Sequence, residues 1–227
     1  MKKKAAKFNF GIQIGNFLAF VRSKLSLMRR DIVEFEKHGI TEDNLTEVET
    51  MASDFEKLSS DEEMLGKQVL ATQEQGAQAE KVREAIREIT NRALRHFGDT
   101  SGKYKQFGNM NLSHLEGGNL GYAGSRVSKV ATGFLTELQP TGLTQAMITN
   151  LDTQVKAYYN KLHAQDDAIA DRDVAAAERA EKANTIYRIV AKYCETGKNI
   201  WVSINEAKYN DYVIYDTPSG GPEAPAA

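Results

Sequence analysis

Residues 39–56 read GITEDNLTEVETMASDFE, and residues 142–159, 103 positions later, read GLTQAMITNLDTQVKAYY. The identical positions are Gly39/Gly142, Thr41/Thr144, Thr46/Thr149 and Thr50/Thr153. Apolar character is kept at Ile40/Leu143, Leu45/Ile148, Val48/Leu151 and Phe55/Tyr158. We interpret these stretches as equivalent parts of two copies of a unit of about one hundred residues. The competing interpretation is a helical pattern that two unrelated segments share.

The apolar residues around these stretches follow the helical period. In the first half, Ile14, Leu18, Val21, Leu25, Met28, Ile32 and Phe35 alternate spacings of four and three, which predicts a helix with one buried face. Gly39 stops this helix, and Thr41 caps a second one through Leu45, Val48, Ala52 and Phe55. A third stripe runs through Leu65, Val69, Thr72, Ala79, Val82, Ile86, Ile89 and Ala93.

The second half repeats this order, with stripes at 127–138, 148–162 and 186–193. The predicted fold is therefore all-α, an elongated helical bundle built from two tandem, internally duplicated three-helix units. The predicted parts are a basic N-terminal arm (1–10), repeat 1 (11–112), repeat 2 (113–216) and a flexible tail (217–227). Three helices in about one hundred residues are similar to spectrin-type repeats, although the joint between these halves is rich in glycine.

The second and third helices of each half could be separate or continuous. Ser60 and Glu63 form a capping-box pattern, which favours a break in the first half. The second half has no such box, and neither glycine nor proline occurs between Gly142 and Gly197, so one long helix is an alternative there. We expect the break in both halves, because a single long helix would leave apolar faces uncovered.

Composition limits the classes of function. A formal net charge of -2 argues against attraction of the whole protein to nucleic acid. The single cysteine, Cys194, cannot form a disulfide within the chain, and we expect it to be a small buried residue of a helix. The basic N-terminus lacks the unbroken apolar run of a signal peptide, and no stretch approaches the ~20 apolar residues that span a bilayer. We expect a soluble, cytoplasmic protein.

No pattern of catalytic or metal-binding residues emerges. A di-iron bundle needs Glu-x-x-His, but Phe35, Ala93, Asn111 and Asn160 stand three residues before the four histidines. The glycines at 118, 121 and 124 follow no strand and precede no Lys-Ser/Thr pair, so they do not form a phosphate-binding loop. We expect no cofactor, no metal and no enzyme activity; a site between helices that leaves no sequence signature is the alternative.

Charge is unevenly distributed near the N-terminus. Residues 1–30 carry eight Lys/Arg and no acid, whereas residues 31–63 carry twelve acids and two lysines. An antiparallel hairpin at Gly39 would place Arg22, Lys24, Arg29 and Arg30 opposite Glu47, Glu49, Asp54 and Glu56. The alternative is a basic amphipathic helix that lies on anionic lipid or on an acidic partner, anchored by Lys2, Lys3, Lys4 and Lys7.

Aromatic residues follow the third helix of each half. The runs KYKQF (103–107) and KYNDY (208–212) lie at equivalent positions, which favours rings that plug the end of a bundle over exposed stacking surfaces. The run YVIYD (212–216) has the pattern of a strand. The candidate interaction residues are Lys2, Lys3, Lys4, Lys7, Arg22, Arg29, Tyr104, Phe107, Trp201, Tyr209, Tyr212 and Tyr215.

These patterns predict a non-enzymatic structural or interaction protein. The expected partners are a second copy of the chain or another protein, bound through helix faces, and not nucleic acid. A peripheral membrane protein that uses the basic first helix is the second hypothesis, and an enzyme or ligand binder with an interhelical site is the third.

Overall fold

The computed structural model describes residues 7–108 and 111–214, and it confirms the all-α prediction. The protein is 82% helical, with about five main helices packed together, and no strand occurs among the described residues. The strand predicted at 212–216 is therefore wrong for residues 212–214, which follow the last helix without pairing to other backbone as a strand, while 215 and 216 lie outside the described residues.

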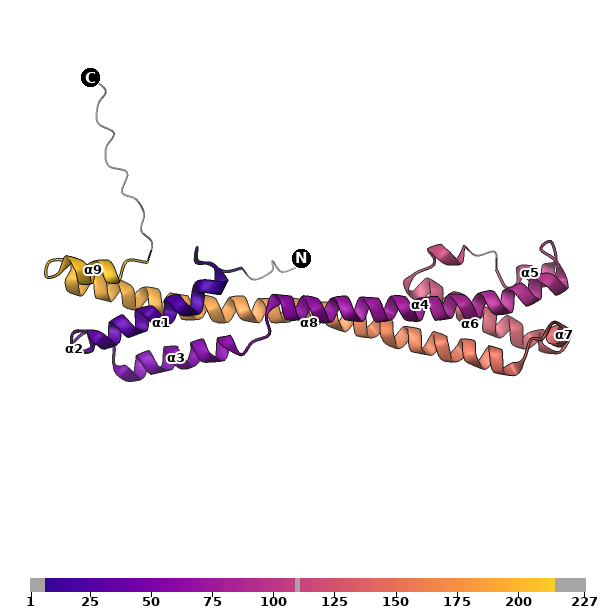
Figure 1. Ribbon diagram of the computed structural model, residues 1–227, viewed down its shortest axis with the longest axis horizontal. Helices are drawn as coiled ribbons and strands as arrows, with labels where there is room; N and C mark the ends of the chain where they lie inside the picture. The colour runs from indigo at the N-terminus through magenta and orange to yellow at the C-terminus, as the bar shows by residue number, and fades with distance from the viewer. Residues whose placement is uncertain (1–6, 109–110, 215–227) are drawn as a thin grey trace, which may run out of the picture. The chain divides into compact units, whose positions relative to one another are not determined.

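The elements are labelled in Figure 1. In chain order they are α1 (Ile14–Arg30), α2 (Ile32–Glu36), α3 (Glu42–Glu56), α4 (Asp61–Phe97), α5 (Gly102–Lys105), η1 (Leu112–His114), α6 (Gly117–Gly133), α7 (Leu135–Leu138), η2 (Gln139–Thr141), α8 (Gln145–Trp201) and α9 (Glu206–Asp211).

The helices form two compact units. Unit 1 contains residues 1–59 and 174–227, and unit 2 contains residues 60–173. Helix α8 therefore gives its N-terminal part to unit 2 and its C-terminal part to unit 1. Each unit combines residues from both halves of the sequence. The predicted repeat boundary at 112/113 falls inside unit 2; as a statement about sequence copies it stays a prediction.

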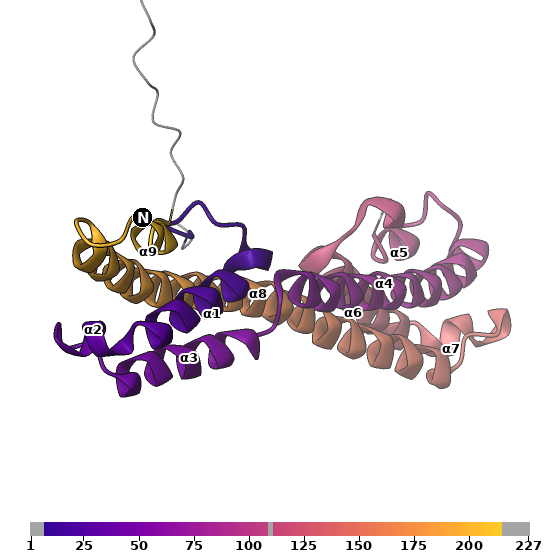
Figure 2. The ribbon, with the colours of Figure 1, turned by 60° about the vertical axis from the view of Figure 1, so that its left-hand side comes forward.

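In unit 1, α1 and α3 form an antiparallel hairpin that packs with the C-terminal part of α8 (Figure 2). The predicted stripe of α1 is largely buried, since Val21, Leu25 and Met28 are at most 1% exposed. Its helix bends at Asp31, where α1 ends and α2 begins. Gly39 then makes the hairpin turn with φ +77°, a conformation that other residues adopt only at a cost.

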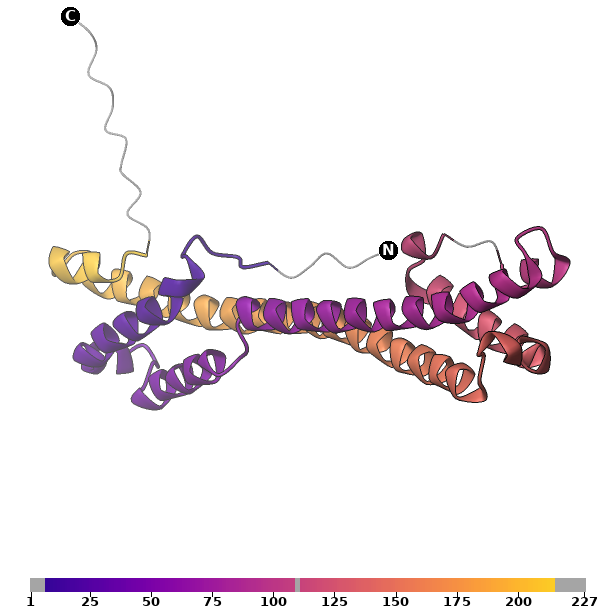
Figure 3. The ribbon, with the colours of Figure 1, turned by 45° about the vertical axis from the view of Figure 1, so that its right-hand side comes forward.

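In unit 2, the corresponding hairpin consists of α6, α7, η2 and the start of α8, with Gly142 at φ +83° in its turn (Figure 3). This hairpin packs on α4, and α5 folds against the end of that helix. Glycines allow α6 to approach closely: a Cβ on Gly124 would lie 2.5 Å from Val155, and one on Gly121 would lie 2.4 Å from Tyr159. Packing thus explains Gly121 and Gly124, whereas nothing lies within 4 Å of a Cβ on Gly118.

The breaks between helices match the sequence in one half only. The Ser60 hydroxyl accepts a hydrogen bond from Glu63 N (3.1 Å) and Ser60 N donates to the Glu63 carboxylate (2.6 Å), which confirms the predicted capping box and the break before α4. The break predicted in the second half is wrong, because α8 is continuous over 57 residues. No capping group, glycine or proline is present there to end the helix.

Replacement of two helical glycines by alanine should change the stability of the protein in opposite directions. Gly197→Ala should destabilise the protein by about 1–3 kcal/mol, because the new Cβ would lie 2.5 Å from the ring of buried Tyr212. Gly76→Ala, where nothing lies within 4 Å, should stabilise it by about 0.5–1 kcal/mol through helix propensity. Urea unfolding followed by circular dichroism measures both, and equal effects would contradict this packing of α8 on the C-terminal segment.

Candidate interaction surfaces

The basic residues of α1 are engaged within unit 1. Arg22 pairs with Glu56 (2.5 Å), and Arg29 pairs with Glu42 (2.7 Å) and Glu49 (2.6 Å), which confirms the predicted hairpin pairing for these two arginines. The exposed Lys7 uses its carbonyl oxygen to accept a hydrogen bond from the Asn184 amide (2.8 Å). The remaining predicted cations Lys2, Lys3 and Lys4 lie outside the described residues.

The pairing predicted for the other two cations of α1 is wrong. Lys24 donates to the carbonyl oxygens of Asp211 (2.5 Å) and Val213 (3.0 Å), and Arg30 pairs with the Asp211 carboxylate (2.9 Å). Both side chains thus bind the end of α9 instead of the acids of α3. The sequence offered no signal for this contact, because residues about 180 positions apart meet only through the fold.

The aromatic candidates belong mostly to the two cores. Phe107 and Tyr212 are 0% exposed and Trp201 is 9% exposed, so these rings are not available to a partner. Tyr104 and Tyr209 are half-buried and pack against the same cores. This burial confirms the interpretation of the aromatic runs as plugs at the ends of helices, and Tyr215 lies outside the described residues.

Sequence analysis missed the central polar residue of unit 1, Asp31. Its side chain is 1% exposed and lies at the bend between α1 and α2. The Arg30 guanidinium (2.7 Å), the Lys208 ammonium (2.6 Å) and the Tyr212 hydroxyl (2.8 Å) all donate hydrogen bonds to its carboxylate. The Tyr212 hydroxyl also lies 3.0 Å from the carbonyl oxygen of Leu27. We call this arrangement the Asp31 latch, because it fastens α9 to the bend.

The latch shifts the ionisation of its members. Burial acts to raise the pKa of Asp31, but the hydrogen bonds from Arg30, Lys208 and Tyr212 outweigh it and lower this pKa to about 2. Burial and the neighbouring carboxylate raise the pKa of the Tyr212 phenol. Asp31 is therefore ionised and Tyr212 protonated at neutral pH, which is the state that holds the network together. The Asp31 side chain is 1% exposed and its carboxylate already accepts hydrogen bonds from three donors, so we assign it a structural role.

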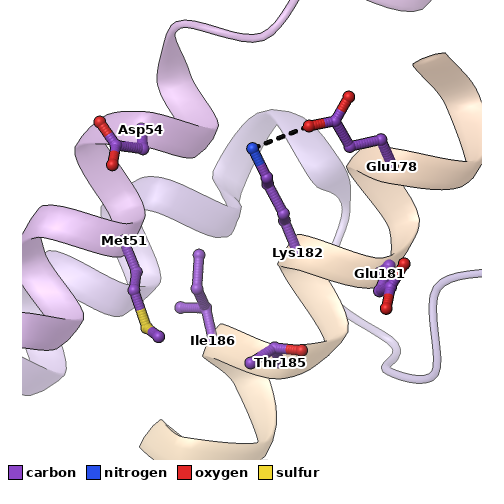
Figure 4. A pocket seen from close by; sticks show the side chains of 7 residues that line it. All are labelled: Met51, Asp54, Glu178, Glu181, Lys182, Thr185 and Ile186. Atoms are coloured by element: carbon purple, nitrogen blue, oxygen red, sulfur yellow. Dashed lines mark ion pairs between the residues drawn. The ribbon is translucent and has the colours of Figure 1, made fainter.

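An acidic groove opens between α3 and α8 in unit 1 (Figure 4), with a volume of about 370 Å³. Its lining residues are Met51, Asp54, Glu178, Glu181, Lys182, Thr185 and Ile186. Ile186 is only 1% exposed and forms an apolar floor with the half-buried Met51. Lys182 reaches the Glu178 carboxylate (2.9 Å), as the dashed line in Figure 4 marks, and Lys57 pairs with Asp54 (2.9 Å). Three carboxylates against two ammonium groups leave the rim with one net negative charge, and neither of these two pairs involves Glu181.

The comparable groove of unit 2 differs in chemistry. It has a volume of about 210 Å³ and is lined by Lys81, Glu84, Ala85, Glu88, Asn150 and Gln154. The Gln78 amide bonds to the Gln154 side chain (2.7 Å) and so fills the position between the helices with polar atoms. An apolar floor beneath an acidic rim is thus a property of the groove in unit 1.

Cys194 is a structural residue. It is 0% exposed and free, and burial raises the pKa of its thiol to about 11, so the thiol stays protonated at neutral pH. This confirms the expected buried cysteine. Across residues 7–108 and 111–214, no cluster of three or more His, Cys, Asp or Glu side chains is arranged to hold a metal ion. Within the same residues, no helix combines the length and apolar character that crossing a membrane requires.

The chain matches no protein-family model, no curated protein sequence and no solved structure.

The Asp31 latch predicts a pH dependence of stability. Because the pKa of Asp31 falls from 3.8 to about 2 on folding, its contribution is present above pH 4 and is lost as the pH falls towards 2. Asp31→Asn should cost about 2–3 kcal/mol at pH 7, since Arg30 and Lys208 lose their shared counter-charge. It should also flatten the unfolding free energy between pH 4 and 2, measured by urea denaturation.

Glu36→Gln is the matched control, because it removes one negative charge from the exposed end of α2. This variant should keep the wild-type pH profile. If Asp31→Asn and Glu36→Gln behaved alike, the latch would not hold α9 in place.

Proposed function

We propose that this protein is a non-enzymatic interaction protein that docks other polypeptides on helix faces. The observation that carries the proposal is the acidic groove of unit 1, where Met51 and Ile186 form an apolar floor beneath the carboxylates of Asp54, Glu178 and Glu181. An apolar floor with a charged rim is typical of peptide-binding surfaces, because burial of an aliphatic side chain supplies affinity and the rim selects charge. The groove suits a segment with lysine or arginine beside an aliphatic residue.

Several properties of the groove favour a peptide over a small-molecule substrate. Its rim carboxylates are largely exposed, with Glu178 at 50% and Asp54 at 58%, so they can attract cations but are poorly placed for general acid or base catalysis. The methionine on its floor adapts its shape easily and is common at surfaces that accept varied partners. We therefore favour docking over catalysis.

The alternative of a lipid-binding first helix has less support. The apolar face of α1 lies in the core of unit 1, and Arg22, Lys24, Arg29 and Arg30 have partners within that unit. Lipid binding would then depend on Lys2, Lys3, Lys4 and Lys7. Flotation with anionic vesicles at low salt distinguishes the two hypotheses. A docking protein should remain at the bottom of the density gradient, whereas a lipid-binding protein should float with the vesicles.

We further propose that the two halves arose by duplication. Support comes from equivalent positions 103 apart that are buried in both units: Phe17/Leu120, Met28/Ala131, Phe35/Leu138, Ile40/Leu143, Leu45/Ile148, Val48/Leu151, Ala52/Val155 and Phe55/Tyr158. The backbone bends at Asp31 (φ −104°, ψ 20°) and at Phe134 (φ −109°, ψ 14°) also correspond. Thr50 and Thr153 make the same 2.9 Å bond to the carbonyl oxygen four residues earlier.

The docking proposal predicts binding of a short basic peptide at the groove. An acetylated Lys-Leu-Arg-Lys tetrapeptide, too short to form a helix, should shift the NMR signal of the ¹³C-labelled methyl group of Met51 and leave that of Met147 in unit 2 unchanged. Glu178→Gln with Glu181→Gln should weaken binding about tenfold, because two exposed charges contribute about 0.5–1 kcal/mol each.

Glu84→Gln with Glu88→Gln provides the matched control, since it removes the same charge from the polar groove of unit 2. This control should change the affinity by less than about twofold. Absence of a Met51 shift at millimolar peptide, or equal weakening by both double variants, would refute docking at the acidic groove.

A further inference from the structure

Unit 2 exposes a row of apolar side chains on the paired helices α4 and α8. Leu65 and Val69 of α4 are each 45% exposed and Ile169 of α8 is 40% exposed, although the sequence pattern predicts burial for the first two. Leu162, which lies seven residues or about two turns before Ile169, is half-buried. Four aliphatic residues on neighbouring turns are more than scattered exposure, and they need a covering partner or a physical reason.

The exposed residues continue rows that are buried elsewhere in unit 2. At seven-residue intervals along α4, Leu65 and Thr72 are followed by Ala79, Ile86 and Ala93, which are all buried. Along α8, the corresponding row is Ile148, Val155, Leu162 and Ile169, and its first two members are buried. The helix that covers the buried ends is α6, whose Gly124 lies against both Val82 and Val155.

The cover ends where α6 begins. The Tyr158 hydroxyl bonds to the carbonyl oxygen of Gly117, the first residue of α6, and to the Gln75 amide of α4. The chain before α6 does not continue over the rows, because the Arg83 guanidinium holds the carbonyl oxygens of Leu112 (3.0 Å) and Leu115 (2.8 Å). Helix α6 covers Ile86 and Val155. Among the described residues of unit 2, no helix covers Leu65 and Ile169 in the same way.

The pairing of α4 with α8 places the exposed residues on one side. The contacts Glu74–Lys161 (2.6 Å), Thr72–Gln165 (3.2 Å) and Gln68–Arg172 (3.0 Å) define an antiparallel pair with a polar seam. In such a pair, residues that lie beside the seam on the same side of both helices are neighbours on one surface of the pair. Leu65 and Thr72 of α4 therefore lie beside Leu162 and Ile169 of α8, on the side that α6 covers further along.

The border of this surface is acidic. Glu62 lies one turn before Leu65 on the outer side of α4, and Asp166 and Asp173 lie in the same way beside Ile169 on α8. All three are exposed. Like charges would face each other if a second copy packed its own surface here, whereas lysine or arginine at the border of a partner helix would be attracted.

We propose that Leu65, Val69, Leu162 and Ile169, named here the open stripe, dock an amphipathic helix of another polypeptide that carries lysine or arginine at its borders. The partner helix lies in line with α6 and completes a three-helix layer with α4 and α8. The surface between Leu65 and Gly76 spans about 16 Å at 1.5 Å per residue, so three turns of partner helix cover it. Gly76, with nothing within 4 Å of a Cβ, leaves room for the partner backbone to approach.

The test uses the full chain with ¹³C-labelled methionine methyl groups and an 18-residue helical peptide with a leucine stripe and lysine borders. Met64 precedes Leu65 in α4 and is only 9% exposed, so its methyl signal responds to a change of packing around Leu65, while Met51 reports on the acidic groove. In about 0.15 M salt, the peptide should shift the Met64 signal. Val69→Asp with Ile169→Asp should weaken this binding at least about tenfold.

Leu70→Asp is the matched control, because Leu70 is 59% exposed but lies around α4 from the open stripe. It should leave the affinity within about twofold. A peptide with glutamate in place of lysine should not bind. Equal weakening by Leu70→Asp, or equal binding of the glutamate peptide, would overturn the proposal.

Two further outcomes would also overturn it. A shift confined to Met51 would place the helical peptide in the acidic groove, which leaves the docking function intact and removes the open stripe from it. If the protein alone sedimented as a dimer and Val69→Asp made it a monomer, the helix that covers the open stripe would belong to a second copy of this chain. If the tetrapeptide did not shift the Met51 signal but the helical peptide still shifted the Met64 signal, only docking at the acidic groove would be refuted.

Discussion

The structure depends on the burial of apolar rows by a third helix. Two helices in contact can hide only a narrow seam, so the wider apolar faces of this chain need a further helix to exclude water. In unit 1, α1 covers the rows of α3 and α8, and in unit 2, α6 covers those of α4 and α8. The cover stops at Gly117, the first residue of α6, and Leu65 and Ile169 beyond it are exposed. The open stripe arises from this incomplete cover.

Polar contacts in the two units serve different purposes. The Asp31 latch is buried and has several partners, so it specifies where α9 lies. The pairs of Arg22 and Arg29 are more exposed and set the register of the hairpin with little effect on stability. Gln68, Thr72 and Gln165 form a polar seam between α4 and α8, which favours one alignment of the two helices at the expense of apolar burial.

Much of the helical architecture could be predicted because its signals are local. Spacings of three and four identified the faces of α1, α3 and α6, and Gly39, Ser60 and Gly142 marked helix ends through backbone conformation or capping. The continuity of α8 was not predicted, since the absence of a stop signal is weaker evidence than its presence. Asp31 was missed as well, because the sequence shows an acid beside a basic residue and not the three donors that the fold brings to it.

Local signals in the sequence were enough to predict α1, α3, α4 and α6 as helices and to identify an apolar face on each, because periodicity and capping act within a few turns. Which helix covers which apolar face is set by the tertiary packing. The C-terminal part of α8 covers α3 in unit 1, and α4 packs with α6 in unit 2, so that each unit draws on both halves of the chain. This choice depends on contacts between residues far apart in sequence, whose energies emerge only when side chains such as Arg83 and Tyr212 meet their distant partners.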